Sequence, residues 1–238
     1  MRQGYLVMDL ETVPDTELYA HPDTPFGEEK PFPPIFAHRP VAIGVLWLGA
    51  DLRLIRLGII GEGQDERGQL DAFSEFVARE GPTLVTWNGR GFDLPVIVLR
   101  CLRHGVGLGW YYGRRDVRYR YSDDGHLDLG DALCDRGATR QTSLDNAARL
   151  IGLPGKMGVD GSQVEGLFRA GRIDEIRQYC LTDVIQTAML LLRYLLLSGR
   201  EERAAVVEAL NGLLEALGED GRFPELLAGI NRPRLLLE

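Results

Sequence analysis

The sequence predicts an α/β domain built on a mixed β-sheet that is flanked by helices. Strand-like segments come first, and helical segments mixed with one further strand follow them, without a regular strand-helix alternation. The chain has 238 residues, of which 45% are hydrophobic, which is enough to bury one sizeable core. We expect residues 1–198 to form this domain and residues 199–238 to form a C-terminal helical extension packed on the same domain.

Alternating or continuous apolar residues predict the strands, which are expected at residues 4–10, 41–48, 52–60 and 83–87. The second and third strands are joined at Gly49-Ala50-Asp51, a connection that predicts an antiparallel hairpin. Between the first two strands, residues 13–40 form a proline-rich excursion that contains Pro14, Pro22, Pro25, Pro31, Pro33, Pro34 and Pro40. Such a loop is expected to cover part of the domain.

Helical spacing of apolar residues predicts helices over residues 65–79, from Pro95 in a first turn to about residue 104, and over residues 173–197, 201–217 and 224–230. The pattern is helical from Ser143 onward, with residues 152–161 as the marked loop. The longest apolar run, residues 188–197, is interrupted by Arg193 and is shorter than the roughly 20 residues that a membrane span needs. We therefore expect a core helix and no membrane association.

Formal net charge is −8 at pH 7, which argues against a protein that coats nucleic acid through a large basic surface. An enzyme that handles the end of a strand needs only a local basic groove, and metal-binding carboxylates themselves add negative charge. Three widely separated cysteines, Cys101, Cys134 and Cys180, predict neither a disulfide framework nor a zinc site. The first residues lack the order of a secretory signal, so we expect a cytoplasmic location.

Two acidic residues, Asp9 and Glu11, lie two apart on the first strand, so their carboxylates project from the same face and can bind one cation. The alternative is a pair of exposed acids at a strand end. The same pattern recurs at Asp15 and Glu17, which follow a proline in a loop. The two pairs therefore differ in their setting, because the first lies on an apolar strand and the second lies in a loop.

A third acid, Asp93, lies between the fourth strand and the following helix, in the stretch from Trp87-Asn88 to Phe92-Asp93. An aspartate just before Pro95 is typical of a helix N-cap. Junctions from strand to helix are also where α/β sheets place ligand-binding side chains. Both interpretations stay open from the residues alone.

A fourth acid, Asp183, lies four residues after Tyr179 on the long helix, so the two side chains share one helical face. Five of the eight tyrosines have an aspartate four residues on, but only this pair falls inside a predicted helix. The neighbouring buried stripe includes Ile176, Cys180 and Val184. A charged residue beside that stripe needs a partner, and a cation is one such partner.

The order of these motifs resembles a known family. Val7-Met8-Asp9-Leu10-Glu11-Thr12, then Trp87-Asn88 through Phe92-Asp93, then Tyr179-Cys180-Leu181-Thr182-Asp183 resemble the three exonuclease motifs of the DEDD superfamily in its tyrosine branch. The chain is similar to the proofreading exonuclease domain of family B DNA polymerases and to the stand-alone bacterial predicted exonucleases related to it. Gly152-Leu153-Pro154-Gly155-Lys156 and Val159-Asp160-Gly161-Ser162 fit the latter group. The resemblance covers roughly residues 4–198.

This resemblance implies an RNase H-like fold and a 3'-5' exonuclease that uses two divalent cations. Asp9 would bridge both ions, Glu11 and Asp183 would complete one site, and Asp93 would support the other. Mg²⁺ fits such oxygen ligands, and Mn²⁺ is expected to substitute. Tyr179 would orient the attacking water rather than act as a base, since a phenol has an ordinary pKa of about 10.

The resemblance also implies substrate contacts, namely Thr12, Asn88, Phe92 and Lys156. Phe92 packs against a base or lies in the core, and Lys156 binds a phosphate or is a solvated loop residue. Residues 100–121 interleave arginines with aromatic residues, which favours either a track for single-stranded nucleic acid or an ordinary β-hairpin with a basic face. Asp128 is expected to cap a helix more than to support the site.

Together these features predict a 3'-5' exonuclease that acts on single-stranded DNA or frayed 3' ends and releases nucleoside 5'-monophosphates. The same chemistry on RNA is an alternative, since nothing in the motifs selects the sugar. A non-catalytic nucleic-acid-binding module is a second alternative, although such a module is expected to have lost a carboxylate. No protein partner is predicted.

Overall fold

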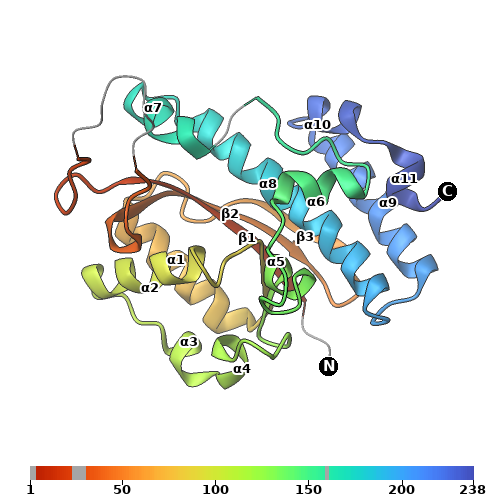
Figure 1. Ribbon diagram of the computed structural model, residues 1–238, viewed down its shortest axis with the longest axis horizontal. Coiled ribbons are helices and arrows are strands. Elements are labelled where there is room, and N and C mark those ends of the chain that lie inside the picture. Colours follow the sequence, from red (N-terminus) through yellow and green to blue (C-terminus); the bar gives the residue numbers. More distant parts are fainter. Residues whose placement is uncertain (1–3, 23–30, 159–160) are drawn as a thin grey trace.

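The computed structural model describes residues 4–22, 31–158 and 161–238, and within them the central feature is a mixed five-stranded sheet in the order β3-β2-β1-β4-β5 (Figure 1). The strands are β1 (Tyr5–Pro14), β2 (His38–Leu48), β3 (Leu54–Ile59), β4 (Thr83–Thr86) and β5 (His126–Asp128). Strand β2 runs antiparallel to both β1 and β3, whereas β4 pairs in parallel with β1 and β5. The predicted hairpin and mixed sheet are confirmed.

Helices cover both faces of the sheet. Helices α1 (Glu66–Glu80) and α2 (Asp93–His104) pack on one face, and the long α8 (Ile173–Leu197) crosses β1 and β2 on the other (Figure 1). The C-terminal helices α9 (Arg203–Asp220), α10 (Pro224–Gly229) and α11 (Arg232–Leu236) lie beyond α8 and share its hydrophobic cluster. The shorter elements are η1 (Ile35–Ala37), α3 (Gly109–Gly113), α4 (Arg115–Arg118), α5 (Leu129–Leu133), α6 (Leu144–Leu150), η2 (Gly161–Gln163) and α7 (Val164–Arg169).

Side-chain alternation along β1 positions the acidic pair. Leu6, Met8 and Leu10 enter the cluster under α1 and α2, whereas Val7 enters the cluster under α8. Because strand residues alternate between faces, Asp9 and Glu11 point toward α8 as Val7 does. The register with β2 shifts directly after Glu11, so a bulge lies at this point of the strand.

Several local predictions are confirmed. Helix α1 lies within one residue of its predicted bounds, Pro95 lies in the first turn of α2, and the long helix has the predicted bounds. Asp65, expected inside the helix, instead caps α1 by accepting a hydrogen bond from the backbone N–H of Gly68. The proline-rich excursion is shorter than predicted, because β1 continues to Pro14 and β2 begins at His38. Pro25 lies outside the described residues.

Residues 100–121 form neither a β-hairpin nor a continuous basic track. They form the end of α2, then α3 and α4, and both Arg100 and Trp110 are buried. The Arg100 guanidinium donates to both carboxylate oxygens of Glu66 and, at 2.6 Å, to Asp15 Oδ2. At 2% exposure it is not accessible to a phosphate. The exposed aromatic residues are Tyr112, Tyr119 and Tyr121, and the guanidiniums of Arg115 and Arg118 lie over Tyr119 and Tyr112. Arg103 and Arg120 are also exposed.

Arg100 is expected to be a major stabilising residue, since it is only 2% exposed and bonds two carboxylates. Arg100→Ala would remove the main partner of both carboxylates, leaving Asp15 with Arg103 at 3.9 Å and Glu66 with His104 at 3.1 Å, which costs about 3–5 kcal/mol in the free energy of unfolding. Arg103→Ala on the same helix is the control, because that side chain is 32% exposed and bonds the solvated Glu17. Urea unfolding measures both variants, and equal losses would contradict the assignment.

Helix α8 is long and apolar enough, by length and composition alone, to cross a membrane. However, 67% of its most apolar window is buried inside the protein, where it packs against β1 and β2. These contacts support its interpretation as a core helix.

Candidate functional site

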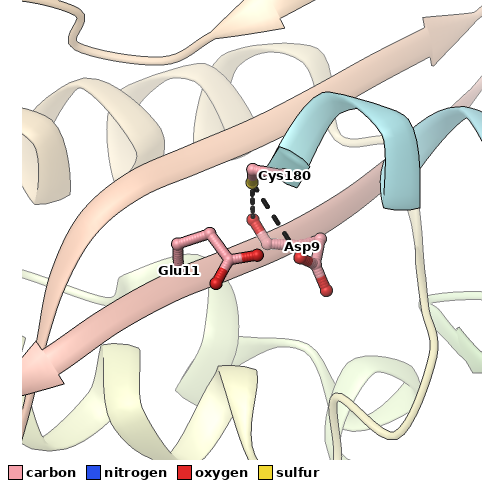
Figure 2. A group of neighbouring side chains, drawn as sticks. All are labelled: Asp9, Glu11 and Cys180. Atoms are coloured by element: carbon pink, nitrogen blue, oxygen red, sulfur yellow. Dashed lines mark hydrogen bonds between the residues drawn. The ribbon is translucent and has the colours of Figure 1, made fainter. Parts of the chain in front are cut away.

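The candidate site lies where α8 crosses β1. One ligand atom from each of Asp9, Glu11 and Cys180 lies within 4.8 Å of the others (Figure 2). The Cys180 thiol donates to the backbone oxygen of Asp9 at 3.5 Å, and its sulfur is 3.9 Å from Asp9 Oδ2. Burial, followed by the charge of Asp9, raises the pKa of Cys180, so the thiol stays protonated and acts as a donor.

The Asp93 carboxylate reaches this site from the start of α2. Its Oδ1 accepts a hydrogen bond from the backbone N–H of Leu10 at 3.0 Å, the residue between Asp9 and Glu11. The N-cap position of α2 is Phe92 rather than Asp93. The interpretation of Asp93 as a helix N-cap is therefore wrong, because the carboxylate bonds across to β1.

Tyr179 and Asp183 approach the same cluster from α8 and are hydrogen-bonded to each other. Burial, followed by the charges of Asp183, Glu11 and Asp9, raises the pKa of Tyr179 far above its ordinary value. The phenol therefore remains protonated at neutral pH, donates its one proton to Asp183, and keeps its oxygen as an acceptor. Exposed Lys156 lies close enough to lower the pKa of Asp183. The following Val159 and Asp160 lie outside the described residues.

The four carboxylates form one electrostatic group. Burial raises the pKa of Asp9, and the charges of Asp93, Glu11 and Asp183 raise it further. Burial and the charges of Asp183 and Asp93 do the same for Glu11. Burial raises the pKa of Asp93 to about 7, although two backbone N–H donors act to lower it. Burial also raises the pKa of Asp183 to about 6, although Tyr179 and Lys156 act to lower it.

This donor set fits divalent cations with a preference for oxygen. Four carboxylates that repel one another in a buried place need positive charge, and Lys156 is exposed. Mg²⁺ and Mn²⁺ prefer carboxylate oxygens, whereas the protonated Cys180 thiol is not a ligand for a hard cation. Cys180 is therefore a positioning residue that holds the backbone of Asp9.

Thr12 and Phe92 lie beside the site in a polar and aromatic cluster. Burial lowers the pKa of His38, whose Nε2 donates to the backbone oxygen of Pro33 at 3.0 Å. The neutral ring then accepts the Thr12 hydroxyl at Nδ1, at 2.8 Å. Phe92 is half-buried and packs edge-on against His38, with ring centroids 4.8 Å apart. The Phe92 ring is thus neither fully buried in the hydrophobic core nor fully exposed to solvent.

Asn88 is exposed and adopts a left-handed backbone conformation with φ of 64°. Its backbone N–H and that of Arg90 donate to the two oxygens of Asp128, each at 2.9 Å. Asp128 also caps α5 by accepting from the backbone N–H of Asp131, which confirms the predicted cap. The same carboxylate therefore fixes the turn that carries Asn88 toward Asp93.

A cleft adjoins the α8 side of the site. It is lined by Tyr179 and Asp183, by Met157 from the preceding loop, and by residues 222–226 of the C-terminal segment. The Gln178 side-chain amide donates to the backbone oxygen of Arg222 at 2.7 Å and ties that segment to α8. The C-terminal helices therefore form one wall of the cleft next to the carboxylates.

Sequence reasoning placed Cys180 on the buried stripe but gave it no part in the site. Its position between Tyr179 and Asp183 was the available signal, since one helical turn brings all three toward the same strand. Gly44 on β2 was also missed. An added Cβ there would lie 2.6 Å from Cys180 Sγ, so the absence of a side chain makes room for the thiol.

Gly44→Ala is expected to destabilise the protein by about 1–3 kcal/mol, because overpacking would displace Cys180 and with it the backbone of Asp9. Gly58→Ala on β3 is the matched control, since nothing lies within 4 Å of the added Cβ. Adding Cys180→Ala to Gly44→Ala should restore part of the stability. Urea unfolding tests all three proteins, and a Gly44→Ala variant as stable as Gly58→Ala would contradict the packing argument.

Comparison with solved structures shows the fold. The chain is similar to the family B DNA polymerase from the hyperthermophilic archaeon Pyrobaculum calidifontis, with 22% identity, a TM-score of 0.57, and coverage of 89% of this chain. It spans only 29% of that polymerase chain. It also matches a product-bound structure of exonuclease I, with 14% identity, a TM-score of 0.36, and coverage of 79% of this chain and 46% of that one. No curated protein sequence matches.

The strand order, the helices on both faces and the match to the polymerase show an RNase H-like fold. The family model for predicted 3'-5' exonucleases related to the exonuclease domain of PolB matches residues 30–227, most of the chain. With the acidic cluster of β1, α2 and α8 in the same molecule, the chain belongs to the family of predicted 3'-5' exonucleases related to the PolB exonuclease domain.

Proposed function

We propose that the protein is a 3'-5' exonuclease that hydrolyses single-stranded DNA from its 3' end and releases nucleoside 5'-monophosphates. The supporting observation is that carboxylates from β1, α2 and α8 form one electrostatic group beside a protonated tyrosine. Two Mg²⁺ ions are the proposed cofactors, and Mn²⁺ is expected to replace them.

Asp9, Glu11 and Asp183 would hold one cation, and Asp93 together with Asp9 would hold the other. Bound there, the two ions would polarise the scissile phosphate, favour ionisation of the attacking water and stabilise the leaving 3' oxygen. The raised pKa of each carboxylate reflects the cost of keeping it charged without a counter-ion. Bound cations would remove that cost.

Tyr179 positions the attacking water in this proposal. Its pKa is raised by burial and by the surrounding carboxylates, so it stays protonated and does not act as a base. Because its proton is donated to Asp183, its oxygen would accept a hydrogen bond from the water. Its bond to Asp183 and its position on a packed helix fix the direction of the hydroxyl. Tyr179→Phe would thus remove a positioning group without removing a ligand.

Four residues would contact the substrate. Phe92 offers a half-buried ring for packing against the terminal base, and Asn88 offers an exposed amide. The Thr12 hydroxyl donates to His38 but keeps its oxygen lone pairs for a nucleotide donor. Lys156 is exposed beside Asp183 and would contact a phosphate.

The test uses DNA oligonucleotides that carry a label at either the 5' or the 3' end, with Mg²⁺, Mn²⁺ or EDTA. We expect the 5' label to give a descending ladder and the 3' label to appear at once as a mononucleotide, only when a metal is present. Asp9→Ala should be inactive. RNA of the same sequence, run in parallel, determines the sugar preference. Binding without cleavage by the wild-type protein, with either metal, would overturn the proposal.

A further inference from the structure

A groove opens beside the candidate site, and among its lining residues only Asn88 has a part in the function proposed above. It is lined by residues 87–88, by residues 140–144 and by Asn146, and is called here the Arg140 groove. Its volume is about 760 Å³, against about 330 Å³ for the cleft next to Tyr179 and Asp183. The Arg140 groove is thus wide enough for more than a single small group.

The charge of the Arg140 groove differs from that of its surroundings. Among the described residues that line it none is acidic, and exposed Arg140 has no ion pair with any described residue. By contrast, Glu175, Asp183 and Glu225 line the cleft beside α8. In a chain of net charge −8, a groove whose lining carries no carboxylate repels a polyanion less than the acidic cleft beside α8 does.

Both walls of the Arg140 groove continue into segments that adjoin the carboxylates. On one wall, Asn88 begins the turn that leads to Asp93. The backbone N–H groups of Gly91 and Phe92 donate to the backbone oxygen of Asn88 in this turn. On the other wall lies the start of α6, whose Asp145 accepts the N–H of Lys156 at 2.7 Å and raises the pKa of Asp183. The groove therefore lies between the segments that adjoin Asp93 and Asp183.

Rigid groups form the floor and the rim of this groove. Trp87 is half-buried and packs against the core cluster of α8, so its ring offers a fixed surface for stacking. The backbone N–H of Asn88 donates to Asp128 Oδ1, and the Ser143 hydroxyl oxygen accepts from the backbone N–H of Asn146. One arginine, one aromatic ring and several neutral polar side chains are the groups that bind single-stranded nucleic acid.

We propose that the Arg140 groove binds the substrate strand on the 5' side of its terminal nucleotide, with Arg140 on a backbone phosphate and Trp87 against a base. This inference rests on the proposed function and adds the path of the strand. It also relocates that path from residues 100–121, where Arg100 and Trp110 are buried.

The test measures binding of a fluorescent ten-nucleotide DNA strand by anisotropy, in an Asp9→Asn background with Mg²⁺ so that the strand stays intact. Arg140→Ala should weaken binding about five-fold and lower the slope of log K against log salt by about 0.7, the value for one phosphate on a single strand. Arg118→Ala is the matched control, since that exposed arginine lies on α4 over Tyr112. It should leave both quantities unchanged.

A second readout uses proteins with Asp9 intact. Arg140→Ala should raise KM for the ten-nucleotide strand with little change in kcat, and should leave hydrolysis of a nucleoside 5'-monophosphate nitrophenyl ester unchanged. Unchanged strand binding by Arg140→Ala would overturn the inference, and so would an equal loss of ester hydrolysis. Absence of cleavage by the wild-type protein would overturn the proposed function instead, while the anisotropy result would still decide the path of the strand.

Discussion

Asp9→Asn is expected to abolish metal-dependent cleavage and, at the same time, to stabilise the metal-free protein. Asp9 is surrounded by the charges of Asp93, Glu11 and Asp183, so a neutral side chain of the same shape removes repulsion that folding must overcome. Loss of a cation ligand costs several kcal/mol of transition-state stabilisation, and each ~1.4 kcal/mol is a factor of ten. We expect a loss of about 10³-fold or more in rate, with a melting temperature that rises by a few degrees at pH 8 in EDTA.

Asp15→Asn is the matched control, because Asp15 and Glu17 repeat the spacing of Asp9 and Glu11. Burial raises the pKa of Asp15, but its bonds with Arg100 and the backbone outweigh burial and lower it below its ordinary value. Asp15→Asn should therefore destabilise the protein, by about 3 kcal/mol for a buried pair, and leave the folded enzyme active. Oligonucleotide cleavage and thermal unfolding of both variants test this, and stability changes of the same sign would contradict it.

Mg²⁺ is expected to stabilise the protein far more at pH 8 than at pH 5. The folded pKa values of Asp9, Glu11, Asp93 and Asp183 all lie above their ordinary values, with Asp93 at about 7. The metal-free folded state thus holds more protons than the unfolded state, so this cluster's contribution to stability falls as pH rises from about 4 through 7. Bound cations remove the repulsion, and their binding needs the deprotonated cluster.

Thermal unfolding at the two pH values, with Mg²⁺ and with EDTA, measures this effect as a difference. At a Mg²⁺ concentration of about 100 Kd, binding contributes about 2.7 kcal/mol, or roughly 5–10 °C in melting temperature at pH 8. Burial lowers the pKa of His38 and His126, which act in the opposite direction below pH 6.5, but they contribute equally with and without the metal. An increase in melting temperature on adding Mg²⁺ that is the same at pH 5 and pH 8 would contradict the account.

Elements with long, regular apolar patterns were predictable from the sequence. The bounds of α8 and, within one residue, those of α1 follow from residues that are neighbours along the chain. Strand β5 has only three residues and carries no periodicity, so its pairing with β4 is visible only in the folded sheet. Helices α3 and α4 were not predictable either, because their interleaved arginines and aromatic residues are equally compatible with a strand.

The site could be predicted in its composition but not in its contacts. Asp9 and Glu11 share a face because strand geometry requires it. By contrast, Asp93 bonds Leu10 across 83 positions and Arg100 bonds Asp15 across 85, and local patterns carry no information on such partners. An arginine is solvated by default, so the burial of Arg100 could be recognised only once its two carboxylates were in place.

The most direct test of the acidic cluster is the number of protons released when Mg²⁺ binds at pH 6, measured by titration calorimetry in buffers of different ionisation enthalpy. With Asp183 at a pKa of about 6, Asp93 at about 7 and the pKa values of Asp9 and Glu11 also raised, the metal-free cluster holds protons that cations must displace. The account predicts release of about one proton or more per chain, and less from Asp9→Asn. Mg²⁺ binding without proton release, or no Mg²⁺ binding at all, would contradict it.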